Sequence, residues 1–299
     1  MKTKKLIIVG GATGIGKTNL VIRLAQKFKS EILSADSRQF YKELNIGVAK
    51  PNKQQLNDIK HHFIGHISIH ESYSVGQYEK DGLKLLNQLF KKNDILFLCG
   101  GSGLYIDALC EGLNIFPDIK NNIKIKTAKD LKEKGINYLI KELKIVDKNT
   151  YDIIDKKNPR RIIRALEVYR STGIPFSNYK LKKKEKRNFQ TLFISLNYNR
   201  DLLYQKINRR AEKMMNNGLI DEVRSLYKFK DLKALQTIGY QEVFEYLDGE
   251  YDLKKTLEEM KKNTRRYAKR QITWFKKIKY QQYKPNDEEK IIELINNYF

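Results

Sequence analysis

The chain has 299 residues, with 59 Lys and Arg against 35 Asp and Glu, which gives a formal net charge of +24 and a pI near 9.7. Hydrophobic residues make up 40% and charged residues 31%, a balance that fits a folded globular protein and excludes a disordered or fibrous one. The excess of positive charge favours a polyanionic partner, although a lysine-rich proteome would produce the same excess.

The N-terminal segment MKTKKLIIVGG contains one short apolar run, LIIV, which is shorter than the roughly 7 to 15 apolar residues of a signal peptide. No run approaches the roughly 18 apolar residues of a membrane span. Cys99 and Cys110 lie in apolar surroundings without a CxxC pair, which indicates buried thiols in a reducing compartment. We therefore expect a cytoplasmic protein that does not associate with a membrane.

The first part of the chain alternates strands with helices. Residues 4–28 predict a strand, a glycine loop and a helix, because a β-branched apolar run precedes apolar residues at helical spacing. Residues 31–40 predict a second strand that ends in a polar turn, and residues 93–109 a third strand followed by a glycine turn and a helix. Such alternation predicts a mostly parallel sheet with its working groups on the loops after the strands.

The texture changes near Pro117 to long charged helical patterns, and a strand pattern returns only at residues 189–198. Residues 200–229 and 257–280 again predict helices. We therefore expect an α/β fold with a P-loop NTPase-like core over residues 1–117 and 188–299. Residues 118–187 are expected to form a helical insertion domain.

Residues 11–18, GATGIGKT, fit the phosphate-loop pattern GxxxxGK[ST] and lie between a predicted strand and a predicted helix. In such a loop backbone amides converge on phosphate oxygens, Lys17 neutralises them, and the Thr18 hydroxyl can hold Mg²⁺. A nucleotide hydrolase would also need an acid after a strand for magnesium. The third strand instead ends in Gly100, Gly101 and Ser102, which disfavours ATP hydrolysis.

Two further polar clusters have open interpretations. Asp36 follows the second strand and is either a general base or magnesium ligand facing the phosphate loop, or an ordinary turn aspartate. All four histidines lie within HHFIGHISIH. Their spacing would suit a zinc site on a helix, but the isoleucines and the glycine favour extended structure and structural histidines. The four are His61, His62, His66 and His70.

Longer motifs resemble those of one enzyme family. From residue 6 to about residue 276 the chain has, in the family's order, GGATGIGKT, SADSRQFYKELNIGVAKP, HHFI, YSVGQY, GGSGLYIDAL, PRRIIRALEVY, GLIDEV, IGY and RRYAKRQITWF. In the sequence and order of these motifs the chain resembles the tRNA dimethylallyltransferases, which are also called IPP transferases. The resemblance implies transfer of a dimethylallyl group from dimethylallyl diphosphate to N6 of the tRNA adenosine on the 3′ side of the anticodon, with release of diphosphate.

The resemblance also implies which residues act. Catalysis is assigned to Asp36, Thr18, Ser102 and Arg210, with Mg²⁺ on Thr18. The donor diphosphate is assigned to Gly11, Ala12, Thr13, Gly14, Ile15, Gly16, Lys17 and Thr18. Contact with tRNA is assigned to Asp36, Ser37, Arg38, Gln39, Ser102, Lys124, Arg160, Arg161, Ile162, Ile163, Arg164, Thr237, Ile238, Gly239, Tyr240, Gln241, Glu242, Lys269, Arg270, Gln271 and Trp274.

In this family-based interpretation Asp36 accepts a proton or hydrogen bond from N6 of a flipped-out adenine, Ser102 holds the same base, and Arg210 reaches the diphosphate. The sequence departs from the family in two places that matter here. Ser102 replaces a threonine, and Lys124 replaces an arginine and so loses its bidentate fork. The expected partners are the anticodon stem-loop of tRNA and dimethylallyl diphosphate, and a monomer is expected.

Other functions stay open at this point. An adenylate (AMP or ATP) isopentenyltransferase and a P-loop nucleotide kinase would share the phosphate loop, and an RNA-binding module without activity would share the charge. The helical insertion, with Arg160, Arg161 and Arg164, and the basic aromatic helix near Trp274 favour tRNA. The run KLKKKEKR at residues 180–187 is expected to contact the phosphate backbone of the stem-loop.

Overall fold

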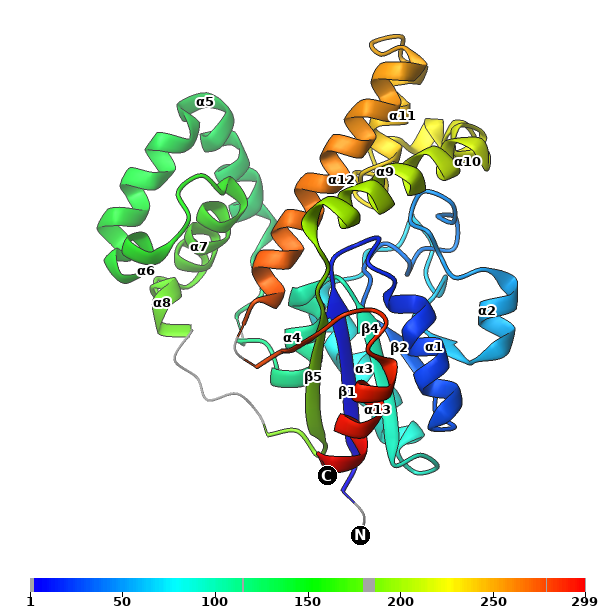
Figure 1. Cartoon of the computed structure of the whole chain (residues 1–299). Coiled ribbons are helices and arrows are strands. Elements are labelled where there is room, and N and C mark those ends of the chain that lie inside the picture. The colour runs from blue at the N-terminus through cyan, green and yellow to red at the C-terminus, as the bar shows by residue number, and fades with distance from the viewer. Residues whose placement is uncertain (1–2, 115, 180–185, 278, 299) are drawn as a thin grey trace. The chain divides into compact units, whose positions relative to one another are not determined.

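The protein was analysed as a computed structural model, which describes residues 3–114, 116–179, 186–277 and 279–298 (Figure 1). It divides into two compact units, residues 1–111 with 187–299 and residues 112–186. The elements of the first unit are β1 (Lys5–Gly11), α1 (Lys17–Lys27), β2 (Ile32–Ser34), α2 (Lys53–Asp58), β3 (His61–His62), α3 (Val75–Leu89), β4 (Ile95–Gly100), α4 (Gly103–Glu111), β5 (Gln190–Leu196), α9 (Arg200–Asn216), α10 (Leu219–Ser225), η1 (Tyr227–Phe229), α11 (Tyr240–Leu247), α12 (Leu253–Phe275), β6 (Gln281–Tyr283) and α13 (Glu288–Asn297). The second unit contains α5 (Asn121–Val146), α6 (Lys148–Ile153), α7 (Pro159–Thr172) and α8 (Phe176–Tyr179).

The first unit is built on a parallel sheet with the strand order β3-β2-β4-β1-β5-β6. Every recorded strand pair is parallel, and Gly10 of β1 lies opposite Gly100 of β4 and Ser195 of β5. The predicted α/β class with a mostly parallel sheet is therefore confirmed. Because parallel strands end at one edge, the loops after β1, β2 and β4 meet there.

Alternation along β1 explains how both faces of this sheet are covered. Ile7 and Val9 belong to one buried cluster with side chains of α1, α9 and α13. Leu6 and Ile8 belong to another with side chains of α3 and α4. A central strand that is buried on both faces reads as a continuous apolar run, which is what LIIV is.

A third cluster holds the helices after β5 together. Met214 of α9, Tyr240 of α11 and Met260 of α12 pack with Leu44 and Val48, which belong to the long loop after β2. This packing matters for the site, because it ties the loop that follows Asp36 to helices that lie some 170 to 220 residues later in the sequence.

The second unit is a small helical body around Leu139, Leu143, Ile162, Ala165 and Leu166. α5 contains a break at Gly135, whose φ is 73°. Arg170 of α7 bridges Asp130 and Glu142 of α5 with N–O distances of 3.0 and 2.5 Å. The four helices α5 to α8 agree with the helical character predicted for residues 118–187. Contact of this unit with tRNA stays a prediction.

Some local features differ from the predicted elements. β6 was not predicted, since a strand of three polar or aromatic residues carries no periodicity. β3 lies in the histidine segment, where extended structure was favoured. The predicted helical stretch 200–229 is broken at Gly218, which has φ 92° and precedes α10. In the run 180–187, residues 180–185 lie outside the described residues, and Arg187 forms an ion pair with Glu79 at 2.5 Å. Within the described ranges, no helix has the length and apolar character of a membrane span.

Candidate active site at the carboxyl edge of the sheet

The phosphate loop lies between the end of β1 and the start of α1. Gly14 and Gly16 adopt φ values of 78° and 104°, which side chains rarely tolerate, so glycine is required at both places. Gly16 caps α1 without any side-chain hydrogen bond to the first-turn amides. Those amides are free to point at a ligand, and the helix dipole adds positive potential there.

Lys17 is held inside this loop. Its Nζ donates hydrogen bonds to the carbonyl oxygens of Gly11 and Ala12, at 2.9 and 2.8 Å. Burial lowers the pKa of Lys17 to about 8, against the raising effects of Cys99 and Asp36, while the positive charge of Arg210 lowers it further. Near pH 8 about half of the Lys17 side chains are therefore neutral amines.

Asp36 interacts electrostatically with two cations, Lys17 and Arg210. Its negative charge raises the pKa of Lys17 and that of Arg210, whose own pKa is lowered overall by burial. One carboxylate oxygen accepts a hydrogen bond from the backbone N–H of Arg38 at 3.0 Å. Among the described residues no hydrogen bond or ion pair is recorded for the Arg210 side chain, so α9 presents a half-buried cation that is open to an anionic ligand.

Ser102 joins the loop after β2 to the loop after β4. Its hydroxyl oxygen accepts a hydrogen bond from the backbone N–H of Ser37 at 3.2 Å and donates to the Ser37 hydroxyl at 3.4 Å. The Tyr267 hydroxyl also hydrogen-bonds Ser102, and burial together with the charge of Asp36 raises its pKa to about 12. Asp36, Ser102 and Tyr267 thus share one polar cluster.

Two of the predicted tRNA-contacting side chains form hydrogen bonds with the protein itself. The Arg38 guanidinium donates to the carbonyl oxygens of Lys233, Ala234 and Gln236 at 3.0 to 3.3 Å. Gln39 donates to the carbonyl oxygens of Val48 and Ala49 at 3.3 and 3.1 Å. In this structure both side chains shape the walls of the site.

The segment 237–242 is also fixed from within. The Glu242 carboxylate accepts from the backbone N–H of Gly239 at 2.6 Å and from Asn263 at 2.8 Å. The Tyr240 hydroxyl donates to Glu222, a residue of the GLIDEV motif that also receives the backbone N–H groups of residues 45–47. Sequence reasoning missed this role of Glu222, because its backbone partners lie about 175 residues away.

The predicted tRNA-contacting residues fall into buried and exposed groups. The side chains of Ile162, Tyr240, Glu242 and Gln271 are at most 6% exposed, which gives them packing or positioning roles here. The exposed residues of the same set remain predicted tRNA contacts. They are Lys124, Arg160, Arg161, Gln241, Lys269 and Arg270. Half-buried members, whose predicted roles are likewise untested, are Ile163, Arg164, Thr237, Ile238 and Trp274.

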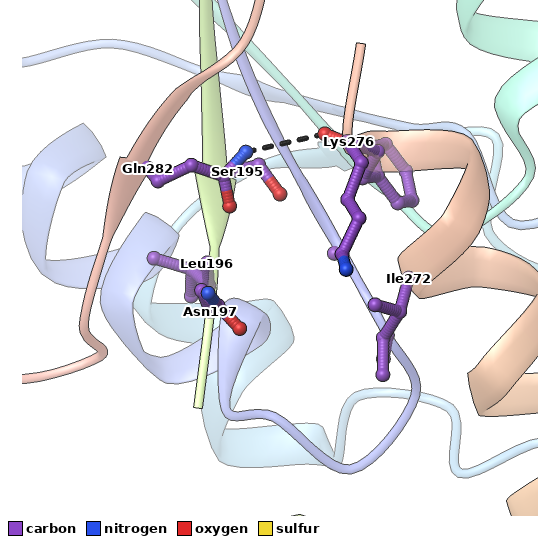
Figure 2. A pocket seen from close by; sticks show the side chains of 9 residues that line it. Ser195, Leu196, Asn197, Ile272, Lys276 and Gln282 are labelled. Atoms are coloured by element: carbon purple, nitrogen blue, oxygen red, sulfur yellow. Dashed lines mark hydrogen bonds between the residues drawn. The ribbon is translucent and has the colours of Figure 1, made fainter. Parts of the chain in front are cut away.

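A small pocket lies beside the phosphate loop (Figure 2). Its wall includes the backbone of Gly11 and Ala12 and none of residues 14–18, so the pocket borders the start of the loop. Figure 2 shows Ser195 and Asn197 at the end of β5 and Lys276 just after α12 around it. Sequence analysis did not single out these residues, because nothing in their local pattern places them next to the loop.

The histidines take structural places. His62 lies 2.6 Å from a carboxylate oxygen of Glu31, and His61 is 2.8 Å from the carbonyl oxygen of Ile59. His66 packs edge-on against Phe40 and Tyr73. Nowhere in the described ranges do three His, Cys, Asp or Glu side chains form a group that could hold a metal ion.

Comparisons with known proteins agree on one family. The family model described as IPP transferase matches residues 39–278. The chain is 49% identical to the tRNA dimethylallyltransferase of Christiangramia forsetii over 272 residues, covering 91% of this chain and 90% of that protein. It is 45% identical to the tRNA dimethylallyltransferase of Flavobacterium johnsoniae, covering 98% of each. The resemblance indicated by the motifs is confirmed.

Solved structures give the same answer for the fold. The tRNA isopentenylpyrophosphate transferase of Bacillus halodurans superimposes with a TM-score of 0.72 at 33% identity, covering 98% of this chain and 95% of that one. A eukaryotic dimethylallyltransferase described as acting on tRNA superimposes with a TM-score of 0.84 at 26% identity, covering 99% of this chain and 79% of that one.

Proposed function

The chain belongs to the IPP transferase family, and from that premise we propose that it is a tRNA prenyltransferase. It transfers a dimethylallyl group from dimethylallyl diphosphate to N6 of the tRNA adenosine that follows the anticodon on its 3′ side, and it releases diphosphate. The observation that carries the proposal is the electrostatic interaction of Asp36 with Lys17 of the phosphate loop and with Arg210. An anion can accept the proton that the amine loses, and two cations can stabilise the diphosphate that leaves.

In the proposed reaction the bond from N6 to C1 of the dimethylallyl group forms while the bond from C1 to the diphosphate oxygen breaks. N6 becomes positive and loses one proton, which Asp36 accepts. The leaving diphosphate takes the electron pair of the broken bond, and Lys17, Arg210 and the first-turn amides of α1 stabilise its charge. The adenine reaches Asp36 only when it is extruded from the stacked anticodon loop, where Ser102 holds it.

Magnesium fits this arrangement through few protein ligands. The Thr18 hydroxyl lies in the first turn of α1 next to Lys17, and no hydrogen bond is recorded for it among the described residues. Mg²⁺ commonly binds through one or two protein oxygens together with substrate phosphates and water. When bound, the ion neutralises charge on the diphosphate, and Thr18 would hold it there.

Binding of tRNA is supported by exposed cations in each of the two units. In the inserted unit Lys124, Arg160 and Arg161 are exposed, and no hydrogen bond or ion pair of their side chains is recorded within the described ranges. In the other unit Lys269 and Arg270 are exposed on α12. Exposed cations of this kind suit phosphate contacts. The proposal includes action as a monomer in the cytoplasm, the compartment predicted from the composition.

The test offers labelled dimethylallyl diphosphate with unmodified tRNA, AMP or ATP in parallel reactions. We expect label on tRNA, released as N6-dimethylallyladenosine after digestion, and none on the free nucleotides. Label on AMP or ATP but not on tRNA would instead establish the adenylate isopentenyltransferase. Transfer of phosphate to a nucleotide would establish the kinase.

A further inference from the structure

One face of α12 runs along both loops of the proposed active site. Tyr267, Gln271 and Phe275 are spaced four residues apart, so their side chains form a single stripe. Tyr267 forms a hydrogen bond with Ser102. Phe275 covers Gly10, where an added Cβ would lie 2.2 Å from the phenyl ring. Gln271, in the middle of the stripe, contacts both loops.

The Gln271 carboxamide bridges the phosphate loop and the loop after β4. Its Oε1 accepts a hydrogen bond from the backbone N–H of Thr13 at 2.8 Å. Its Nε2 donates to the carbonyl oxygen of Gly101 at 2.9 Å. The residue is 6% exposed, and an added Cβ at Gly101 would lie 2.2 Å from Nε2. The carboxamide therefore fills the space between the two backbones and leaves no room for a larger neighbour.

This bridge needs a side chain that donates at one end and accepts at the other. Thr13 offers an N–H and Gly101 a carbonyl, and a planar amide of glutamine length satisfies both. Thr13 belongs to the loop proposed to hold the donor, and Gly101 directly precedes Ser102, which is proposed to hold the adenine. The two reacting groups are thus carried by loops that the same side chain fixes to each other.

On the basis of the proposed function, we propose that Gln271 is a positioning residue of the transfer reaction, which holds the donor loop and the adenine loop at a fixed separation. Reacting atoms need to lie about 3 to 3.5 Å apart, and a misplacement of about 1 Å can cost roughly 100-fold in rate. Loss of the bridge should therefore slow the bond-forming step while each substrate still binds its own loop.

The central experiment compares Gln271→Met with wild type in single-turnover transfer at saturating tRNA and dimethylallyl diphosphate. Methionine has a similar length and removes both hydrogen bonds. We expect a rate about 10- to 100-fold lower, with the Kd for each substrate within threefold of wild type. Gln77→Met is the matched control, since Gln77 is an exposed glutamine on α3 whose amide donates to Asp81. The rate of this variant should be unchanged.

A second variant separates positioning from general weakening of the structure. Protonated glutamic acid has the same donor and acceptor arrangement as glutamine, whereas the carboxylate lacks the donor. The rate of Gln271→Glu relative to wild type should therefore rise at least about fivefold between pH 8 and pH 6, because burial raises the pKa of a carboxyl group. The same ratio for Gln271→Met should stay flat. If the methionine variant does not fold, the pH series of Gln271→Glu decides alone.

Two results would overturn the inference while leaving the proposed function intact. One is a saturating rate of Gln271→Met within threefold of wild type, together with a flat ratio for Gln271→Glu. The other is a tRNA Kd raised more than tenfold with an unchanged saturating rate, which would make Gln271 a tRNA contact. Failure of the proposed function itself is a different outcome, because wild type would then transfer no label to tRNA.

Discussion

The phosphate loop and the loop after β2 both carry conspicuous motifs, and they differ in which groups they leave for a ligand. In the phosphate loop the first-turn amides of α1 receive no side-chain cap, while Lys17 donates to the carbonyl oxygens of Gly11 and Ala12 in the same loop. In the loop after β2, Arg38 and Gln39 donate to carbonyl oxygens of the protein, and Lys50 does the same with Tyr41 and Lys42. The difference teaches that a motif can mark the scaffold of a site as strongly as its chemistry.

Asp36 is the residue of the second loop that is proposed to accept the proton, and its replacement should show the largest effect. Asp36→Asn removes the proposed proton acceptor and keeps the size of the side chain. We expect single-turnover transfer to fall by about 10²- to 10⁴-fold with binding of both substrates retained. Asp58→Asn, at an exposed position on α2, is the control. A rate within threefold of wild type would end the assignment of Asp36 as the base.

Arg38 tests whether the second loop is scaffold. Lysine keeps the charge but cannot reach three carbonyl oxygens, so Arg38→Lys should lower the free energy of unfolding by about 1 to 3 kcal/mol. Amide exchange in residues 233–236 should become faster. Arg209→Lys, at an exposed arginine on α9, should change neither the free energy of unfolding nor the rate of this amide exchange. Unchanged stability with weaker tRNA binding would show instead that Arg38 contacts tRNA, as the resemblance implies.

The pKa of Lys17 gives a test of the ligand-facing loop. In the free protein the ammonium form dominates below pH 8, and above it a proton must be taken up when diphosphate binds. The Kd for dimethylallyl diphosphate should therefore be about tenfold weaker at pH 9 than at pH 7. Lys17→Arg stays protonated, so its Kd should be flat over this range. If the Kd of Lys17→Arg rose as steeply between pH 7 and pH 9 as that of wild type, the titrating group would not be Lys17.

The exposed arginines of α7 provide the smallest effect, on salt dependence. Each phosphate contact that is lost should flatten the plot of log affinity against log salt by roughly 0.7 to 0.9. Replacing Arg160 and Arg161 with glutamine should therefore reduce the slope by up to about two units, with no change in the Kd for the donor. Arg224→Gln, an exposed arginine already paired with Asp221, is the control. An unchanged slope would remove α7 from the tRNA interface.

The parts of this site that sequence could predict are those in which pattern and function are local. A β-branched strand, glycines and Lys17 in one stretch predict the phosphate loop and the parallel sheet, and both are present. The role of Gln271 could not be predicted in this way. A polar residue in a basic helix reads as exposed, and its partners, Thr13 and Gly101, lie 258 and 170 residues away. Arg38 is a similar case, since its acceptors are carbonyl oxygens and carry no side-chain signal.

The strand order has a consequence for how the chain folds during synthesis. β1 pairs on one side with β4 and on the other with β5, and residues 112–186 separate those two partners in the sequence. The ribosome therefore exposes one edge of β1 until the whole inserted unit has emerged. Closing a loop of that length costs entropy that grows only slowly with its length, but it delays completion of the sheet. A helical insertion made of local contacts can fold in that interval. Its folding shortens the flexible connection between β4 and β5 before β5 pairs with β1.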